Sequence, residues 1–181
     1  MTRLEGKVAI ITGAGSGFGE AIAHGYVAQG AHVLVADIAV ENGKRVVEEI
    51  TAKKYSGNGS AIFIEFDVTK RSSWEEGLAL AKEKFGKLDI VVNNAGTTYK
   101  KQASMGLPEA EFDKILAVNV KSIFLSVSVV MPYMVERKSG VFLSTSSVAG
   151  TRVRPGQVFY GGTKGFLNTV SFRTLVGYML Y

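Results

Sequence analysis

The chain has 181 residues, enough for one domain with a sizeable core, and its 46% hydrophobic and 20% charged residues are typical of globular proteins. It contains no cysteine, which excludes disulfides and thiolate metal sites. The formal net charge is +5, but the basic residues are scattered rather than gathered in a stripe, so we expect no nucleic-acid partner.

Short apolar runs alternate with helical patterns along the first half of the chain. The first run, residues 8–11, is continuously apolar, which is typical of a strand buried on both faces. A glycine-rich turn at residues 13–19 leads into a helix that Gly30 ends. A second strand at residues 32–37 is followed by a helix at about residues 41–53.

The second half continues the alternation. We expect strands at residues 61–67, 88–93 and 140–145, helices at residues 72–85 and about 109–137, and a last helix that starts near Phe159. Pro132 should bend or break the long helix. Strands that alternate with helices indicate crossover units and a parallel sheet, in which ligands bind beyond the carboxyl ends of the strands.

No linker, repeat, secretory signal or apolar run of membrane-spanning length is visible in the sequence. We therefore expect a single cytoplasmic domain over residues 1–181, with no membrane partner.

Residues 12–19, Thr-Gly-Ala-Gly-Ser-Gly-Phe-Gly, stand between a strand and a helix. Glycines there let the backbone turn tightly and approach a pyrophosphate, which then faces the N–H groups and positive dipole of the helix. A plain tight turn is the alternative, but the position favours nucleotide binding. The predicted contacts are Gly13, Ser16, Gly17, Phe18 and Gly19.

Asp37 ends the second strand, 18 residues after Gly19. A carboxylate there can accept both ribose hydroxyls of NAD and would repel the 2′-phosphate of NADP. Ser16 also leaves the loop without an arginine that would bind such a phosphate. NAD is therefore the predicted cofactor in preference to NADP, and a turn-forming or capping aspartate is the alternative interpretation.

Two further strand ends point toward the same ligand. Asp67 and Val68 end the third strand, where an adenine ring would lie, although an aspartate there could equally cap the next helix. Asn94, Ala95 and Gly96 end the fourth strand, where small residues and an amide allow close approach of a cofactor but also suit a simple turn.

Tyr160 and Lys164 are four residues apart and therefore share one face of a helix. A lysine ammonium beside a phenol stabilises tyrosinate, which makes the hydroxyl a usable proton carrier near neutral pH. Any helix offers this spacing by chance, but here it closes the series that begins with the glycine-rich turn.

Together these segments resemble the short-chain dehydrogenase/reductase family, and within it the 3-oxoacyl-carrier-protein reductase-like members. The matching pieces occur in the family's order between residue 4 and about residue 170: Thr12-Gly13, Gly17-Phe18-Gly19, Asp67-Val68, Asn93-Asn94-Ala95-Gly96, Asn119, Ser147, Tyr160 and Lys164. The resemblance implies an α/β fold with a Rossmann-type doubly wound parallel sheet. It also implies NAD(P)-dependent interconversion of a small-molecule secondary alcohol and a ketone.

The resemblance assigns roles to single residues. Tyr160 would be the general acid in reduction and the general base in oxidation, while Lys164 would lower the pKa of that tyrosine and hold the nicotinamide ribose. Ser147, 13 residues before Tyr160, would hydrogen-bond the substrate oxygen, with Ser146 as a competing candidate. Asn119 would anchor a water that connects Lys164 to solvent. Residues 97–99 and 152–157 should rim the substrate pocket.

The remaining polar and aromatic candidates favour no second chemistry. His24 and His32 stand apart from carboxylate clusters in the sequence, so we expect packing or surface residues and no metal site. We expect Trp74 to pack on a helix face rather than to contact a substrate.

Family members continue for several tens of residues beyond the last predicted helix, so we expect a fold that lacks the family's last strands. Val141, Phe142 and Leu143 should then form an open sheet edge, and four side chains of the last helix should lose part of their cover: Phe166, Leu167, Val170 and Leu175. A full-length form should be a homo-oligomer. The alternative function is a truncated, catalytically weak nucleotide-binding remnant that acts as a dimerisation partner.

Overall fold

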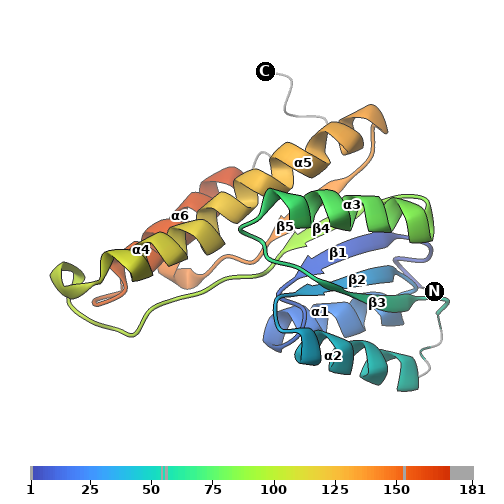
Figure 1. Cartoon of the computed structure of the whole chain (residues 1–181), viewed down its shortest axis with the longest axis horizontal. Coiled ribbons are helices and arrows are strands. Elements are labelled where there is room, and N and C mark those ends of the chain that lie inside the picture. Colours follow the sequence, from blue (N-terminus) through green and yellow to red (C-terminus); the bar gives the residue numbers. More distant parts are fainter. Residues whose placement is uncertain (1, 54, 56, 153, 172–181) are drawn as a thin grey trace.

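A parallel five-stranded sheet forms the centre of the protein (Figure 1). The structure is a computed structural model, and it describes residues 2–53, 55, 57–152 and 154–171. The strands are β1 (Val8–Thr12), β2 (His32–Asp37), β3 (Ser60–Glu65), β4 (Ile90–Asn93) and β5 (Val141–Ser144). Their order is β3-β2-β1-β4-β5, which confirms the predicted Rossmann-type arrangement.

Helices cover both faces of this sheet, with α3 and α5 on one side and α1 and α2 on the other (Figure 1). The helices are α1 (Gly17–Ala28), α2 (Val40–Ala52), α3 (Arg71–Phe85), α4 (Glu109–Leu116), α5 (Ser122–Glu136) and α6 (Val158–Ser171). Three shorter turns accompany them: the 3-10 turns η1 (Ser104–Gly106) and η3 (Val148–Gly150), and the π turn η2 (Ala117–Lys121).

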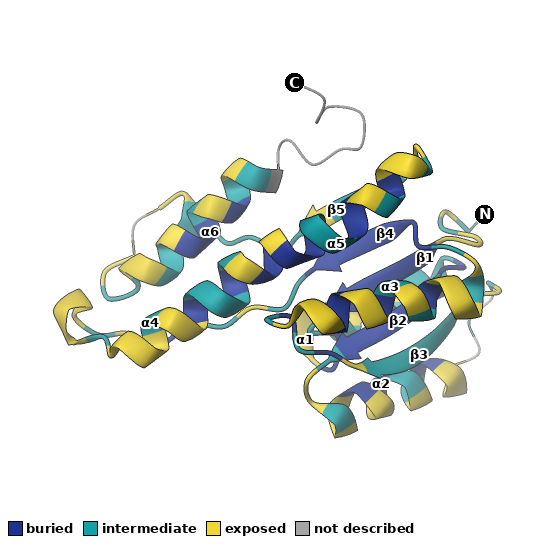
Figure 2. Cartoon of the chain, turned by 45° about the horizontal axis from the view of Figure 1, so that its top comes forward, coloured by how far each residue is buried: buried dark blue, intermediate teal, exposed yellow. Residues whose placement is uncertain are grey.

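Successive residues of β1 enter two different cores. Val8 and Ile10 pack with side chains of α3 and α5, while Ala9 and Ile11 pack with side chains of α1 and α2. This two-sided burial, visible as the dark central strands of Figure 2, is the physical reason for the continuous apolar run in the sequence.

The predicted element types and order agree with the structure, but β3, β4 and β5 are shorter than predicted. Phe66 and Leu88 cause part of the difference, because both are almost fully buried but lie just outside the strands. An apolar residue beside a strand satisfies the hydrophobic pattern whether or not its backbone joins the ladder.

Of the two effects predicted for Pro132, a break is wrong, while a bend stays a prediction. Helix α5 continues through Pro132 to Glu136, and the irregularity lies instead in the π turn η2, between α4 and α5. A proline inside a helix costs about 3 kcal/mol. Burial of Val130, Met131 and Met134 beside it stabilises the helix by more than that, since each such side chain contributes about 1.5–3 kcal/mol.

The stretch Glu109–Glu136 forms 28 helical residues, long and apolar enough by length and composition to cross a membrane. The expectation that no run reaches that length is therefore wrong. One face of this helix packs against α3 and the sheet (Figure 2), and core helices of soluble proteins reach the same apolar content, so the helix is weak evidence for a membrane. The absence of a membrane partner stays a prediction.

Strand β5 lies at the edge of the sheet, as expected, and within the described residues no strand pairs with its outer side. Leu143 is 44% exposed there, while Val141 and Phe142 are half-buried. On α6, Phe166 is exposed, but Leu167 is buried, so the expectation of lost cover is wrong for Leu167. Leu175 lies outside the described residues.

Candidate active site

The candidate site lies at the point in the sheet where the strand order changes direction, between β1 and β4. Strand β1 has β2 on one side and β4 on the other, so the loops that follow β1 and β4 diverge and leave a crevice at their carboxyl ends. A cleft of about 590 Å³ opens there. The predicted cofactor residues that line it are Gly13, Ser16, Gly17, Phe18, Asp37, Asp67, Val68, Asn94, Ala95 and Gly96.

Gly19, Tyr160 and Lys164 were also predicted to contact the cofactor but do not line this cleft. Five lining residues were not among the predicted contacts: Ile38, Phe66, Thr97, Lys114 and Val118. Ile38 is 65% exposed in the cleft. Its position directly after the strand-end acid Asp37 is the sequence signal that could have identified it.

Glycine is required at two positions of the first loop, Gly17 and Gly19, for different structural reasons. Gly17 has a φ of +58°, and a Cβ built on it would meet no atom within 4 Å, so its backbone faces open space in the cleft. A Cβ on Gly19 would instead collide with the carbonyl oxygen of Gly13. Gly17 therefore leaves room for a ligand, and Gly19 lets helix α1 pack against its own loop.

Thr12 and Asn94 tie the ends of β1 and β4 together. The buried Thr12 hydroxyl oxygen accepts hydrogen bonds from the backbone N–H groups of Asn94 at 3.0 Å and Ala95 at 3.1 Å. The Asn94 side-chain amide donates to the Thr12 carbonyl oxygen at 2.9 Å. Thr12 belongs to the glycine-rich motif but was not predicted as a site residue. Its hydroxyl at the end of an otherwise apolar strand is a sequence signal that could have identified it.

The Asp37 carboxylate is held by two backbone groups. Its Oδ2 accepts from the N–H of Gly15 at 2.7 Å, and its Oδ1 accepts from the N–H of Ala39 at 2.8 Å. The second bond forms the turn that the alternative interpretation predicted. A carboxylate has about four lone-pair sites, so the turn does not prevent it from accepting ribose hydroxyls as well.

Asp67 does not cap the next helix. Its Oδ1 accepts from the backbone N–H and the hydroxyl of Thr69, at 2.9 and 2.7 Å, whereas α3 begins after Lys70 without a side-chain cap. Burial raises the pKa of Asp67, but the hydrogen bonds from Thr69 and the charge of Lys70 outweigh it and hold that pKa below its usual range. The capping interpretation is wrong, and the adenine contact stays a prediction.

Asn119 lies in the π turn η2 and is buried. Its Oδ1 accepts from the backbone N–H of Thr97 at 2.8 Å, and its Nδ2 donates to the Thr97 carbonyl at 2.9 Å and to the Thr163 hydroxyl at 3.0 Å. The side chain thus joins the loop after β4 to helix α6, one residue before Lys164.

Lys164 is a buried cation with its ammonium beside Tyr160. Its Nζ donates to the carbonyl oxygen of Thr145 at 2.8 Å and lies 5.9 Å from the centre of the Tyr160 ring. Burial lowers the pKa of Lys164. A Cβ built on Gly96 would lie 3.4 Å from both Lys164 Nζ and Asn119 Oδ1, so Gly96 connects these groups with the cleft.

The two candidate serines differ in what their hydroxyls do. The Ser146 hydroxyl donates toward Asn168 Oδ1 at 2.5 Å and the Lys164 carbonyl at 3.1 Å, so its only proton is used inside the protein. The Ser147 hydroxyl accepts from the N–H of Ala149 at 3.2 Å at the start of η3. No acceptor within the described chain binds the Ser147 proton, which supports Ser147 as the donor to a substrate.

The two expected rim segments lie together beside the start of α6. The side-chain amide of Gln157 donates to the Thr98 hydroxyl at 3.3 Å, and the N–H of Phe159 donates to the Tyr99 hydroxyl at 3.2 Å. The loop after β4 and the loop before α6 are therefore one surface next to Tyr160.

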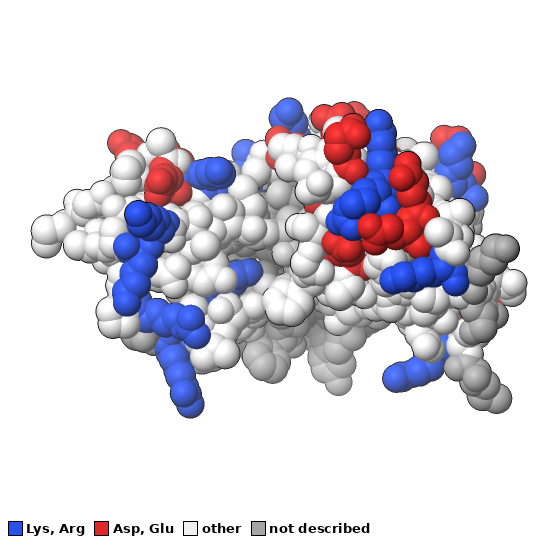
Figure 3. Space-filling view, turned by 90° about the horizontal axis from the view of Figure 1, so that it is seen from below, with Lys and Arg blue, Asp and Glu red and all other residues white. Residues whose placement is uncertain are grey.

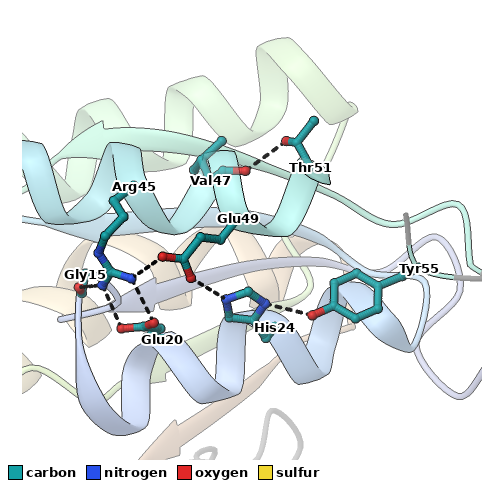
Figure 4. A network of polar contacts seen from close by, with 8 residues as sticks. All are labelled: Gly15, Glu20, His24, Arg45, Val47, Glu49, Thr51 and Tyr55. Atoms are coloured by element: carbon teal, nitrogen blue, oxygen red, sulfur yellow. Dashed lines mark hydrogen bonds and ion pairs between the residues drawn. The ribbon is translucent and has the colours of Figure 1, made fainter. Parts of the chain in front are cut away.

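Helices α1 and α2 carry acidic and basic side chains side by side on the surface in Figure 3. There the expectation that His24 stands apart from carboxylates is wrong, because its Nε2 lies 3.8 Å from Glu49 Oε2 (Figure 4). Packing of α1 on α2 joins residues 25 apart in sequence. The packing roles expected for His32, stacked on Phe85 at 4.8 Å, and for the fully buried Trp74 are confirmed.

Comparison with known proteins supports one family. A model described as short chain dehydrogenase matches residues 7–174. An uncharacterised oxidoreductase of Listeria innocua is 38% identical over 89% of this chain. The 3-oxoacyl-[acyl-carrier-protein] reductase of Thermotoga maritima is 36% identical over 90% of this chain.

Among solved structures, a 3-ketoacyl-(acyl-carrier-protein) reductase from Brucella melitensis, crystallised with NADH, superposes with a TM-score of 0.85 and 37% identity. The match covers 92% of this chain and 67% of that one. The chain spans 63% of the length of the Listeria relative and 64% of the Thermotoga relative.

Proposed function

The chain belongs to the short-chain dehydrogenase family, and from that premise we propose that it works as an NAD-dependent oxidoreductase that interconverts a secondary alcohol and a ketone. One observation carries the proposal. Gly96 lines the nucleotide cleft and also lies against Asn119 and Lys164, so a ligand bound in the cleft would end beside the Tyr160 and Lys164 pair.

The residues of the cleft fit a dinucleotide. The open backbone at Gly17 faces the space where a pyrophosphate would lie, at the N-terminus of α1. Asp37 would bind the adenosine ribose, and its charge favours NAD over NADP. Asp67 and Val68 would contact the adenine, and Lys164 the nicotinamide ribose. Bound NAD would supply the hydride chemistry.

The chain's own residues would manage one proton. In reduction the Tyr160 hydroxyl would give its proton to the substrate oxygen, which the Ser147 hydroxyl would also hydrogen-bond. The Lys164 ammonium beside the ring would stabilise the resulting tyrosinate. Asn119 would hold a water that returns a proton toward Lys164; in its support, Asn119 Oδ1 and Lys164 Nζ both lie close to Gly96.

The substrate would be a small alcohol or ketone, and the whole protein a homo-oligomer. A catalytically weak nucleotide-binding protein that acts in dimerisation is the second candidate. NADH binding without turnover, even after the chain is extended with a relative's C-terminal segment, would favour this second candidate.

The experiment compares Tyr160→Phe with the parent in that extended form. Turnover of a panel of secondary alcohols should fall by a factor of about 10²–10⁴, since the phenol carries the proton. The dissociation constant for NADH, measured by fluorescence titration, should stay unchanged, and NADPH should bind more weakly than NADH. Retention of most turnover would sink the role of Tyr160, and tighter NADPH binding would show that the ribose site is misplaced.

A further inference from the structure

Arg45 of α2 connects two helices to the glycine-rich loop at the end of the nucleotide cleft (Figure 4). Its Nη1 donates to Glu20 at 3.1 Å and to Glu49 at 2.7 Å. Its Nη2 donates to the second oxygen of Glu20 at 2.9 Å and to the carbonyl oxygen of Gly15 at 3.1 Å. Glu20 therefore binds both ends of the guanidinium, which sets its orientation.

An exposed ion pair usually contributes little to stability, but this one also reaches the backbone of the site. Gly15 is bound on both sides: its carbonyl accepts from Arg45, and its N–H donates to Asp37 Oδ2 at 2.7 Å. The fit around it is close, since a Cβ on Gly15 would lie 2.9 Å from Asp37 Oδ2 and 3.1 Å from Asn42 Cβ.

Glu20, Glu49 and His24 could be read as ligands of a metal ion, because their donor atoms lie within 4.8 Å of one another. The guanidinium of Arg45 already binds both carboxylates, however, so a metal ion would have to compete with it. The cluster is therefore better explained as a device that orients Arg45 than as a cation site.

We propose that Arg45, oriented by Glu20 and Glu49, is a positioning residue for the adenosine end of the cofactor site: it holds Gly15, and through Gly15 the Asp37 carboxylate, in the ribose-binding geometry. The inference rests on the proposed function. A preformed carboxylate binds more tightly because less ordering is required when the ligand arrives. Arg45 touches neither the cofactor nor the substrate in this role.

The test uses the 181-residue chain and NADH as the fluorescent probe. Arg45→Met and Glu20→Met should each raise the dissociation constant of NADH about tenfold. The pair separates positioning from simple charge, because the first change removes a positive charge and the second removes a negative one. If Arg45 acted only by attracting the anionic NADH, Glu20→Met would tighten binding, and that result would overturn the proposal.

Two further variants act as controls. Lys44→Met removes the neighbouring cation of α2, whose ion pair is with the exposed Glu41, and should leave the dissociation constant within twofold of the parent. Arg45→Lys keeps the charge but cannot reproduce the planar fork, so its affinity should lie between those of the parent and Arg45→Met.

Fragment binding distinguishes positioning from a general loss of structure. In Arg45→Met the affinity for AMP, which carries the adenosine ribose, should fall about tenfold, as it does for NADH. The affinity for nicotinamide mononucleotide should not change. An equal loss for both fragments, or a dissociation constant for NADH within twofold of the parent, would overturn the proposal.

Hydrogen exchange of the Gly15 amide in the chain without ligand is an independent measurement. It should accelerate about tenfold in Arg45→Met, because Gly15 would lose one of its two fixed contacts. Unchanged exchange would overturn the inference. A parent that binds neither NADH nor AMP would overturn the proposed function instead, and the exchange rate would still decide whether Arg45 holds the loop.

Discussion

Lys164 illustrates at the scale of one residue how function and stability oppose each other. Its side chain is 6% exposed, and the contacts described for its ammonium are a single carbonyl oxygen and the ring face of Tyr160. Burial disfavours the charged form, which is why the pKa of Lys164 is lowered. A cation that is buried in this way is a candidate for a chemical role, because a lysine on the surface would avoid the desolvation free energy.

Lys164→Met should therefore leave the protein at least as stable as the parent at pH 7, while removing the ammonium that the proposed chemistry needs. An apolar side chain of similar volume avoids the desolvation of the buried charge. The free energy of unfolding, measured with urea, tests the stability, and turnover of the extended form tests the chemistry.

The pH dependence provides a second test of Lys164. Its pKa in the folded state is below the ordinary value of 10.5, so between these two values the unfolded state binds more protons than the folded state. The parent's free energy of unfolding should consequently gain a rising contribution as pH increases toward 10.5, and the advantage of Lys164→Met should shrink. A variant clearly less stable than the parent at pH 7 would contradict this account.

At the scale of elements, the π turn η2 decides the position of Asn119. One extra residue in the turn separates α4 from α5, and π turns of this kind often occur at functional sites. The buried amide then bonds the loop after β4 and helix α6 at once. Two elements that would otherwise only pack together are joined by polar contacts of defined geometry.

Asn119→Ala should lower the free energy of unfolding by about 1–3 kcal/mol, because it removes the partner of the half-buried N–H and C=O of Thr97 and of the buried Thr163 hydroxyl. Ser128→Ala on α5 is the matched control: its hydroxyl bonds within its own helix and with Arg71, so the change should stay within about 0.5 kcal/mol. Equal effects of the two substitutions in urea unfolding would show that Asn119 does not connect the elements.

At the scale of the whole molecule, the sheet is covered on both faces but open at β5. Leu143 of this edge strand is exposed, and an uncovered apolar edge strand favours pairing with other chains. The relatives are longer than this chain, which spans 63% of the Listeria protein.

We expect the chain expressed by itself to be less soluble, and to melt at a lower temperature, than a form extended with a relative's C-terminal segment. Leu143→Lys should raise the soluble yield of the short chain, since a charged residue discourages edge pairing. Val135→Lys, which replaces a similarly exposed side chain on α5, should help less. Equal yields from both substitutions, or from the short and extended forms, would show that the edge does not limit solubility.

The sequence by itself determined the order and type of the elements and the glycine-rich loop. Apolar periodicity and glycine positions are local properties of the sequence. They predict the elements correctly when each element buries the face that its pattern indicates. The cleft residues Gly17, Asp37 and Gly96 were found for this reason: they stand at the carboxyl ends of strands, and parallel strands bring all such ends to one edge of the sheet.

Only the tertiary structure decided the contacts between elements. The bond from Arg45 to Gly15, the approach of His24 to Glu49 and the bond from Ser146 to Asn168 each depend on how two segments pack, at separations that no local pattern records. Packing also allowed α5 to continue through Pro132 and placed the irregular turn at Asn119. The physical reason is that a buried polar group can bond only with the groups that the packed elements place next to it. That packing depends on all the elements together and not on any one segment of the sequence.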